Sequence, residues 1–142
     1  MTELAKELIK EKIAQCAEAL LDLQKYQKVG TIDYLRAHPD TYYAVCYRFI
    51  GAIESLFDIG QFLLASKEVR AESQRDIPAR MAQAGMIDAA LAEQFITMYG
   101  FRNRLVHAYG SLDDAKVTEY LADHLVDIET LLRVAQKRII EE

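Results

Sequence analysis

Proline and glycine, the residues that break helices, are scarce in this 142-residue chain, which has two prolines and six glycines. It also has no tryptophan. No run of apolar residues is long enough to span a membrane, and the charged N-terminal segment lacks the apolar stretch of a secretory signal. With 51% hydrophobic and 27% charged residues, the composition favours a helix-rich globular protein. We therefore expect a cytoplasmic protein with no membrane partner.

Cysteine is equally scarce, and the familiar cofactor motifs are absent. Cys16 and Cys46 are accompanied by no C-x-x-C pair and no Cys/His cluster, so buried free thiols are favoured over a disulfide or a metal pair. The sequence contains no G-x-x-x-x-G-K, G-x-G-x-x-G, H-E-x-x-H or G-x-S-x-G. These absences weaken redox, nucleoside-triphosphatase and serine-hydrolase functions, and we expect no metal and no cofactor.

Positive charge is in deficit, since the formal net charge is −5 and the pI is about 5.2. Tight nonspecific binding of nucleic acid depends on basic patches. Any contact with RNA therefore has to be local or transient.

Apolar residues recur at helical spacing along most of the chain, and no strand-like alternation interrupts them. We expect main helices over 2–26, 40–66, 88 to 107 or 109, and 113–140, with short ones over 31–38 and after Asp76. Gly60 and Gly100 lie inside two of these helices: Gly60 predicts that another backbone comes close, and Gly100 predicts close packing against a neighbour. The predicted fold is an all-α antiparallel bundle of four main helices plus one or two short ones, in a single domain over 1–142.

One polar residue interrupts the third of these apolar stripes. The stripe of Leu91, Phe95 and Met98 continues onto Arg102 and then reaches Tyr109. A guanidinium stays charged at physiological pH, so placing it at a core position costs free energy unless it is paired or faces a polar cleft. Arg102 therefore indicates a site.

The helical angles separate the polar residues that follow this arginine. At about 100° per residue, Tyr109 lies about 20° from Arg102, whereas His107 lies about 140° away and next to Asn103. An unbroken helix cannot bring arginine and histidine onto one small substrate. Either the helix unwinds near His107, or the two side chains meet across an interface with a second copy.

Two carboxylates and another histidine also lie on the predicted helices. Glu54 and Asp58 share one helix face at i, i+4, which is either a solvated face or the source of a partner for Arg102. His124 continues the stripe of the last predicted helix and is interpreted as a hydrogen-bonded core or interface histidine.

The motif region has the residue types needed for phosphodiester cleavage without a metal. Arg102, Asn103, Arg104, His107 and Tyr109 fall within eight residues. A neutral histidine can take the proton of a ribose 2′-hydroxyl, and an arginine can stabilise the charge on the phosphate. The simpler alternative is a helix end with exposed polar residues and one arginine in a salt bridge.

The same residues resemble the HEPN superfamily and, within it, the HepT-like toxins of toxin–antitoxin pairs. The family pattern R-x(4–6)-H, extended to H-x-Y, corresponds to Arg102, His107 and Tyr109, and the polar residue after the arginine corresponds to Asn103. Residues 52–65 resemble the second long helix of the family, and residues 82–113 resemble its signature region.

The resemblance implies a homodimer with a shared cleft, a metal-independent endoribonuclease acting on RNA, and an MNT-type nucleotidyltransferase antitoxin that adds adenylate to Tyr109. Aromatic residues in 40–66 also exceed what one interior contact needs, which favours a dimer. These residues are Tyr42, Tyr43, Tyr47, Phe49 and Phe57. The alternative function is a non-catalytic HEPN-like subunit that docks a nucleotidyltransferase or a nucleotide.

Overall fold

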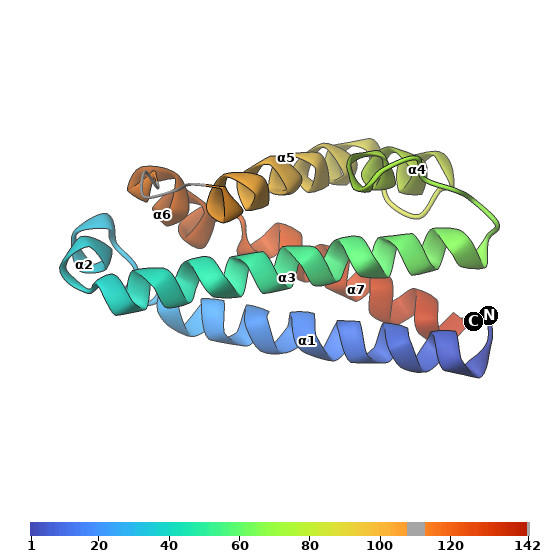
Figure 1. The fold of residues 1–142 in the computed structure, drawn as a ribbon, viewed down its shortest axis with the longest axis horizontal. Helices are drawn as coiled ribbons and strands as arrows, with labels where there is room; N and C mark the ends of the chain where they lie inside the picture. Colours follow the sequence, from blue (N-terminus) through green and yellow to red (C-terminus); the bar gives the residue numbers. More distant parts are fainter. Residues whose placement is uncertain (108–112, 142) are drawn as a thin grey trace.

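Residues 1–107 and 113–141 are described by the computed structural model, and this part of the chain is helical without a strand (Figure 1). The four long helices are α1 (Glu3–Gln27), α3 (Pro39–Ser66), α5 (Ala89–Val106) and α7 (Leu125–Glu141). The shorter elements are α2 (Ile32–Ala37), the 3₁₀ turn η1 (Gln74–Asp76), α4 (Ile77–Gln83) and α6 (Asp114–Asp123). The predicted all-α bundle with four main helices is confirmed.

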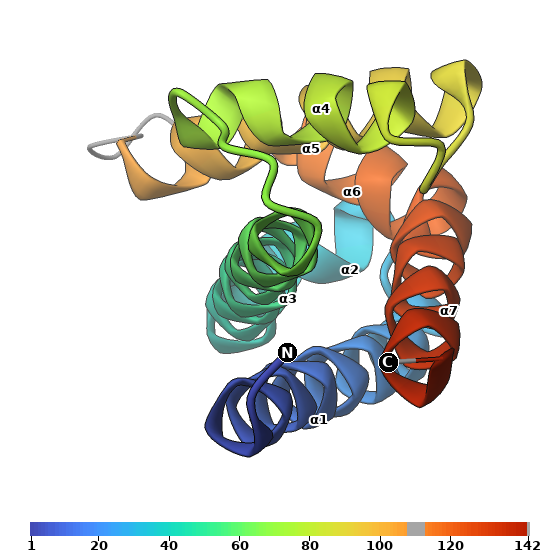
Figure 2. The same cartoon turned by 90° about the vertical axis from the view of Figure 1, so that its right-hand side faces the viewer.

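Helix α3 is the centre of this arrangement. In Figure 1 it runs between α1 on one side and α5 on the other, and in Figure 2 α7 closes the bundle next to α1. Phe49 and Phe57 of α3 are fully buried, and their rings meet Phe101 at 5.2 Å and Phe95 at 4.3 Å between centroids. These aromatic contacts fix α5, and with it the motif, against α3.

The apolar character of α3 follows from its central place. By length and composition alone α3 could cross a membrane, yet 56% of the relevant stretch is buried inside the bundle. A helix surrounded by other helices needs apolar residues on most of its circumference. The core of the bundle therefore accounts for this composition.

Helix starts agree with the sequence, with one correction. Thr2 and Asp88 accept hydrogen bonds from the backbone N–H groups of Ala5 and Leu91, as N-caps do. Asp76 precedes α4 as predicted but makes no capping bond. Its carboxylate is already used by Arg80, at 3.0 Å.

The two helix-interior glycines behave differently. A Cβ on Gly60 would lie 2.7 Å from Ile77 Cγ2, so α4 does pack closely here, but side chains rather than the predicted second backbone make the approach. A Cβ on Gly100 would meet nothing within 4 Å, so the prediction of close packing there is wrong within the described chain. Gly100 lies on the exposed side of α5, where no helix of the bundle passes.

The predicted helix over 113–140 is two helices, because the chain bends at His124 between α6 and α7. The backbone of His124 leaves helical geometry at φ −114° and ψ 2°. Its imidazole packs on Tyr120, with 4.4 Å between centroids, and its Nδ1 lies 3.2 Å from Asp127 Oδ2. The bend lets α6 pack near α2 while α7 lies along α1 and α3.

Candidate functional site

Arg102 lies in the last turns of α5, on the side that faces α3. Its side chain is 14% exposed, so most of the guanidinium and its stem are removed from water. The Tyr99 ring, one turn earlier, lies below the guanidinium with Cζ 5.5 Å from the centroid. This partly buried position is the one that the apolar stripe of the sequence indicated.

The guanidinium is held by acceptors from three elements. Nη1 donates to Asn103 Oδ1 at 2.7 Å, and Nη2 donates to Gln74 Oε1 at 3.1 Å. Nε is buried and donates no hydrogen bond to the described residues, and its ion-pair partner Glu54 Oε1 is 3.6 Å away. Two neutral amides and one longer contact to a carboxylate therefore surround the positive charge.

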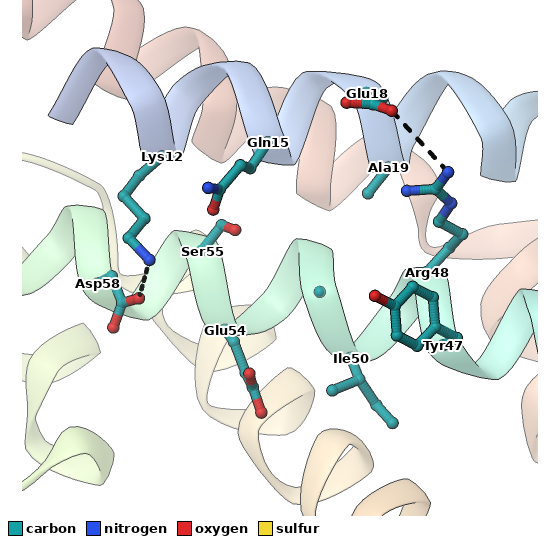
Figure 3. Close-up of a pocket in the computed structure, with 11 residues that line it drawn as sticks. Lys12, Gln15, Glu18, Ala19, Tyr47, Arg48, Ile50, Glu54, Ser55 and Asp58 are labelled. Atoms are coloured by element: carbon teal, nitrogen blue, oxygen red, sulfur yellow. Dashed lines mark ion pairs between the residues drawn. The ribbon is translucent and has the colours of Figure 1, made fainter. Parts of the chain in front are cut away.

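The two candidate carboxylates of α3 have different partners. Glu54 makes the contact with Arg102, and its side chain is 49% exposed. Asp58 instead forms an ion pair with Lys12 of α1, with Nζ 3.1 Å from Oδ2 (Figure 3). Four residues turn the helix by about 40° more than one full turn, and this offset directs Asp58 towards α1, so of the two only Glu54 belongs to the surroundings of Arg102.

His107 is the residue at which α5 ends. Its backbone N–H still donates to the Asn103 carbonyl at 2.9 Å, so the helix is regular up to this residue and ends immediately after it. The side chain is exposed. The helix does not unwind before His107, which is therefore placed about 140° around the helix axis from Arg102, and the backbone leaves helical geometry at His107 itself, at φ −106° and ψ 18°.

The remaining motif residues flank this helix end. Arg104 is exposed, and its Nη2 lies 3.9 Å from Asp113 Oδ2, just before α6. Asn103 lies one turn before His107, where we expect it to orient the imidazole or the phosphate, and its side-chain oxygen accepts from Arg102 Nη1. Tyr109 lies outside the described residues.

A groove of about 310 Å³ runs between α1 and α3 and reaches the site through Glu54 (Figure 3). Figure 3 shows Arg48 reaching from α3 towards α1, while Glu54 points away from α1. Arg48 pairs with Asp22 at 2.6 Å and with Glu18 at 4.0 Å. Cations in this groove are thus matched by carboxylates.

The cysteines lie in the interior and carry no reactive character. Both are free and buried, as predicted. Burial raises the pKa of the Cys16 thiol to about 12 and that of the Cys46 thiol to about 11. Among the described residues no group of three or more His, Cys, Asp or Glu could hold a metal.

Sequence reasoning missed Gln74. It belongs to η1, 28 residues before Arg102, in a mixed-charge segment to which the sequence assigns no part of the site. No periodicity links a turn to a distant helix, so the sequence contained no signal for this contact. The position of Tyr99, three residues before Arg102, could have been read from helical spacing.

Comparisons with known proteins agree on the fold and the family. Residues 16–135 match the family described as ribonuclease HepT-like. A protein of Archaeoglobus fulgidus named "Putative RNase" is 31% identical over 103 residues, which is 72% of this chain and 71% of that protein.

Two solved structures have the same architecture. A chain from a crystal structure of a toxin–antitoxin with AMP-PNP superposes with a TM-score of 0.82 at 23% identity, over 92% of this chain and 98% of that one. A tri-AMPylated Shewanella oneidensis HEPN toxin in complex with MNT antitoxin gives a TM-score of 0.82 at 23% identity, over 96% and 99%. At this identity the likeness shows the HEPN fold. Together with the match over 16–135, it leads to the conclusion that this chain belongs to the HepT-like ribonuclease family.

Proposed function

We propose that this chain is the toxin of a toxin–antitoxin pair and cleaves RNA as a metal-independent endoribonuclease. The proposal treats residues 1–142 as one HEPN-like domain acting in the cytoplasm. The observation that carries it is the state of Arg102, a cation that is 14% exposed and is held mainly by neutral amides, five residues before a histidine at the helix end. Such a cation keeps its attraction for a phosphate.

The chemistry proposed for the site needs no metal and no cofactor. The imidazole of His107 takes the proton of a ribose 2′-hydroxyl, and the resulting oxygen attacks the adjacent phosphorus. The bond from phosphorus to the 5′ oxygen breaks, and that oxygen takes a proton from the imidazolium or from water. Arg102 stabilises the negative charge that builds on the phosphate oxygens. The products are a 2′,3′-cyclic phosphate and a 5′-hydroxyl.

A homodimer is part of the proposal because one chain separates the two catalytic groups. The backbone N–H of His107 still bonds to Asn103, so the residue is placed about 140° around the helix axis from Arg102. On the adjacent face of α3, Tyr43 and Tyr47 are 64% and 71% exposed. Two exposed aromatic rings one turn apart suit burial against a second copy, and a two-fold contact would bring Arg102 of one protomer near His107 of its partner.

Neutralisation is proposed to come from an MNT-type nucleotidyltransferase that adds adenylate to Tyr109. The similar solved structures are described as a toxin–antitoxin with AMP-PNP and as a tri-AMPylated HEPN toxin with MNT antitoxin. Added phosphodiesters would place negative charge and bulk beside Arg102 and compete with an RNA phosphate. Co-expression with such an enzyme should yield an adenylate mass on Tyr109 together with loss of cleavage. A neutralised but unmodified protein would instead indicate inhibition by binding.

The decisive test is incubation of the purified protein with single-stranded RNA in excess chelator. Cleavage that yields 2′,3′-cyclic phosphate ends, and that is lost in His107→Ala, is the expected result. Full activity of His107→Ala would overturn the mechanism. Light scattering at micromolar concentration should report a dimer, and monomer alone would reject the shared site.

The second candidate is a non-catalytic subunit that docks a nucleotidyltransferase or a nucleotide. The net charge of −5 and the carboxylate of Glu54 near Arg102 favour it, because both weaken attraction for RNA. Retained binding to the nucleotidyltransferase, with no cleavage of any RNA by the wild-type dimer, would select this function.

A further inference from the structure

Gln74 occupies a turn that the chain fixes firmly. Asp76 Oδ2 accepts from the Glu72 backbone N–H at 3.1 Å and from Arg80 Nε at 3.0 Å, which closes the turn around η1. Directly after it, Ile77 is buried and packs over the place where Gly60 lacks a Cβ. The turn is therefore closed by Asp76 and joined to α3 through Ile77, which defines the position of the Gln74 backbone relative to the bundle.

From this turn the Gln74 side chain reaches α5 and binds Arg102. Its amide oxygen accepts from Nη2 at 3.1 Å, while Asn103 accepts from Nη1 at 2.7 Å. A guanidinium has five N–H donors. Two are used by these neutral amides and the Nε–H lies nearest Glu54, which leaves one further N–H on each Nη nitrogen.

The neutrality of this acceptor matters for the charge that a ligand would meet. A carboxylate in the place of the Gln74 amide would hold the guanidinium equally well by geometry, but it would also oppose the charge of a phosphate that approaches the same nitrogen. An amide fixes the orientation and leaves the charge in place.

We propose that Gln74 is a positioning residue that orients the Arg102 guanidinium for a phosphate group without adding negative charge beside it. This inference rests on the proposed function, in which Arg102 binds the phosphate of RNA. It assigns to the α3–α4 connection a part in the site that lies entirely outside the 101–109 motif.

The test compares Gln74→Glu with Gln74→Ala in the full-length protein. Glutamate keeps the acceptor and adds charge, whereas alanine removes the acceptor and adds none. We expect kcat/KM for RNA cleavage to fall at least about tenfold in Gln74→Glu and by less in Gln74→Ala, because a charge-assisted pair competes with the substrate. The free energy of unfolding should follow the opposite order, with the glutamate variant at least as stable as the alanine variant.

A matched control is Gln83→Glu. Gln83 also accepts from an arginine, with Arg80 Nη1 at 3.5 Å, but it lies at the end of α4. The control adds the same charge to the neighbouring segment, and its activity should stay within about twofold of wild type because exposed charges are well screened. A merely structural role for Gln74 would reverse the order of activities, with glutamate more active than alanine, and that result would overturn the proposal.

A second readout separates this inference from the proposed function. Inorganic phosphate should shift the Arg102 Nε–Hε resonance in wild type and in Gln83→Glu, and at least about tenfold more phosphate should be needed in Gln74→Glu. A wild-type protein that binds phosphate in this way but cleaves no RNA would refute the ribonuclease function and keep the role of Gln74. Equal phosphate binding in wild type and Gln74→Glu, or none in wild type, would refute the role of Gln74.

Discussion

Two partly buried arginines on opposite flanks of α3 have opposite kinds of partner. Arg48, in the groove towards α1, has Nη2 2.6 Å from Asp22 Oδ2 and 4.0 Å from Glu18 Oε1. Arg102, on the flank towards α5, donates to the amides of Asn103 and Gln74, and its carboxylate partner Glu54 is more distant, with Oε1 3.6 Å from Nε.

The difference separates a cation that serves the fold from one that is available to a ligand. A direct carboxylate partner offsets the charge of a cation, so little attraction for another anion remains. An amide satisfies the hydrogen bond and leaves the charge. The groove has a second offset pair, Lys12 with Asp58 at 3.1 Å. Close carboxylates therefore offset the cations on the α1 flank. On the α5 flank, the close partners of Arg102 are neutral amides, so more of its charge remains available to a ligand.

The largest expected effect is on catalysis at the flank towards α5. Arg102→Ala and His107→Ala should each lower RNA cleavage by about 10²–10⁴-fold, because each removes a group that acts on the reacting phosphate or proton. Arg133→Ala, which breaks only the pair with Glu129 on α7, serves as the control and should stay near wild type. Initial rates with a labelled RNA measure the effect. Equal loss of RNA cleavage in all three variants would contradict a special role of the flank towards α5.

Packing at the two glycines should give the next largest effect. Gly60→Ala forces a Cβ to within 2.7 Å of Ile77 Cγ2 and 3.1 Å of Met81 Sδ, so we expect a loss of about 1–3 kcal/mol in the free energy of unfolding. Gly100→Ala meets open space in the described chain and should gain about 0.5–1 kcal/mol from its helix propensity. Urea denaturation of both variants measures the difference. A destabilising Gly100→Ala would reveal a contact made by a second copy.

Stability should also distinguish the two arginines themselves. Arg48→Met leaves Asp22 without its close partner and should lower the free energy of unfolding by about 1 kcal/mol, given that both side chains are partly exposed. Arg102→Met leaves mainly neutral amides and removes a desolvated charge, so its stability should stay within about 0.5 kcal/mol of wild type or rise. Thermal unfolding at low and high salt checks this, and a larger loss for Arg102→Met would contradict it.

The smallest effect concerns the interior thiols and pH. Cys16 and Cys46 have a pKa raised from 9.0 to about 12 and about 11, so their stabilising contribution is complete below pH 9 and is lost as pH rises through these values. Near pH 8 neither thiol of the native protein should react with a thiol-specific reagent on the timescale of minutes, and both should react in denaturant. A thiol-specific chromogenic reagent measures this. Rapid native reaction of one thiol would show that the α1–α3 contact opens.

Much of this protein followed from its sequence, because apolar spacing and capping are local. The stripes located the four main helices, Thr2 and Asp88 marked helix starts, and the polar interruption at Arg102 singled out a partly buried cation as the candidate site. The family resemblance came from the same stretch. The bend at His124 was missed because neither proline nor glycine causes it, and it depends on the contacts of its ring with Tyr120 and Asp127.

Only the tertiary structure decided what surrounds the guanidinium. By sequence, Glu54 and Asp58 were equally possible partners for Arg102. Because α3 lies between α1 and α5, Asp58 pairs with Lys12 of α1 and Glu54 lies near Arg102 of α5. Gln74 reaches Arg102 across 28 residues, because a turn closed by Asp76 and seated on Gly60 holds it there. Such contacts depend on how distant elements pack, and neither helical spacing nor residue type encodes that packing in one segment.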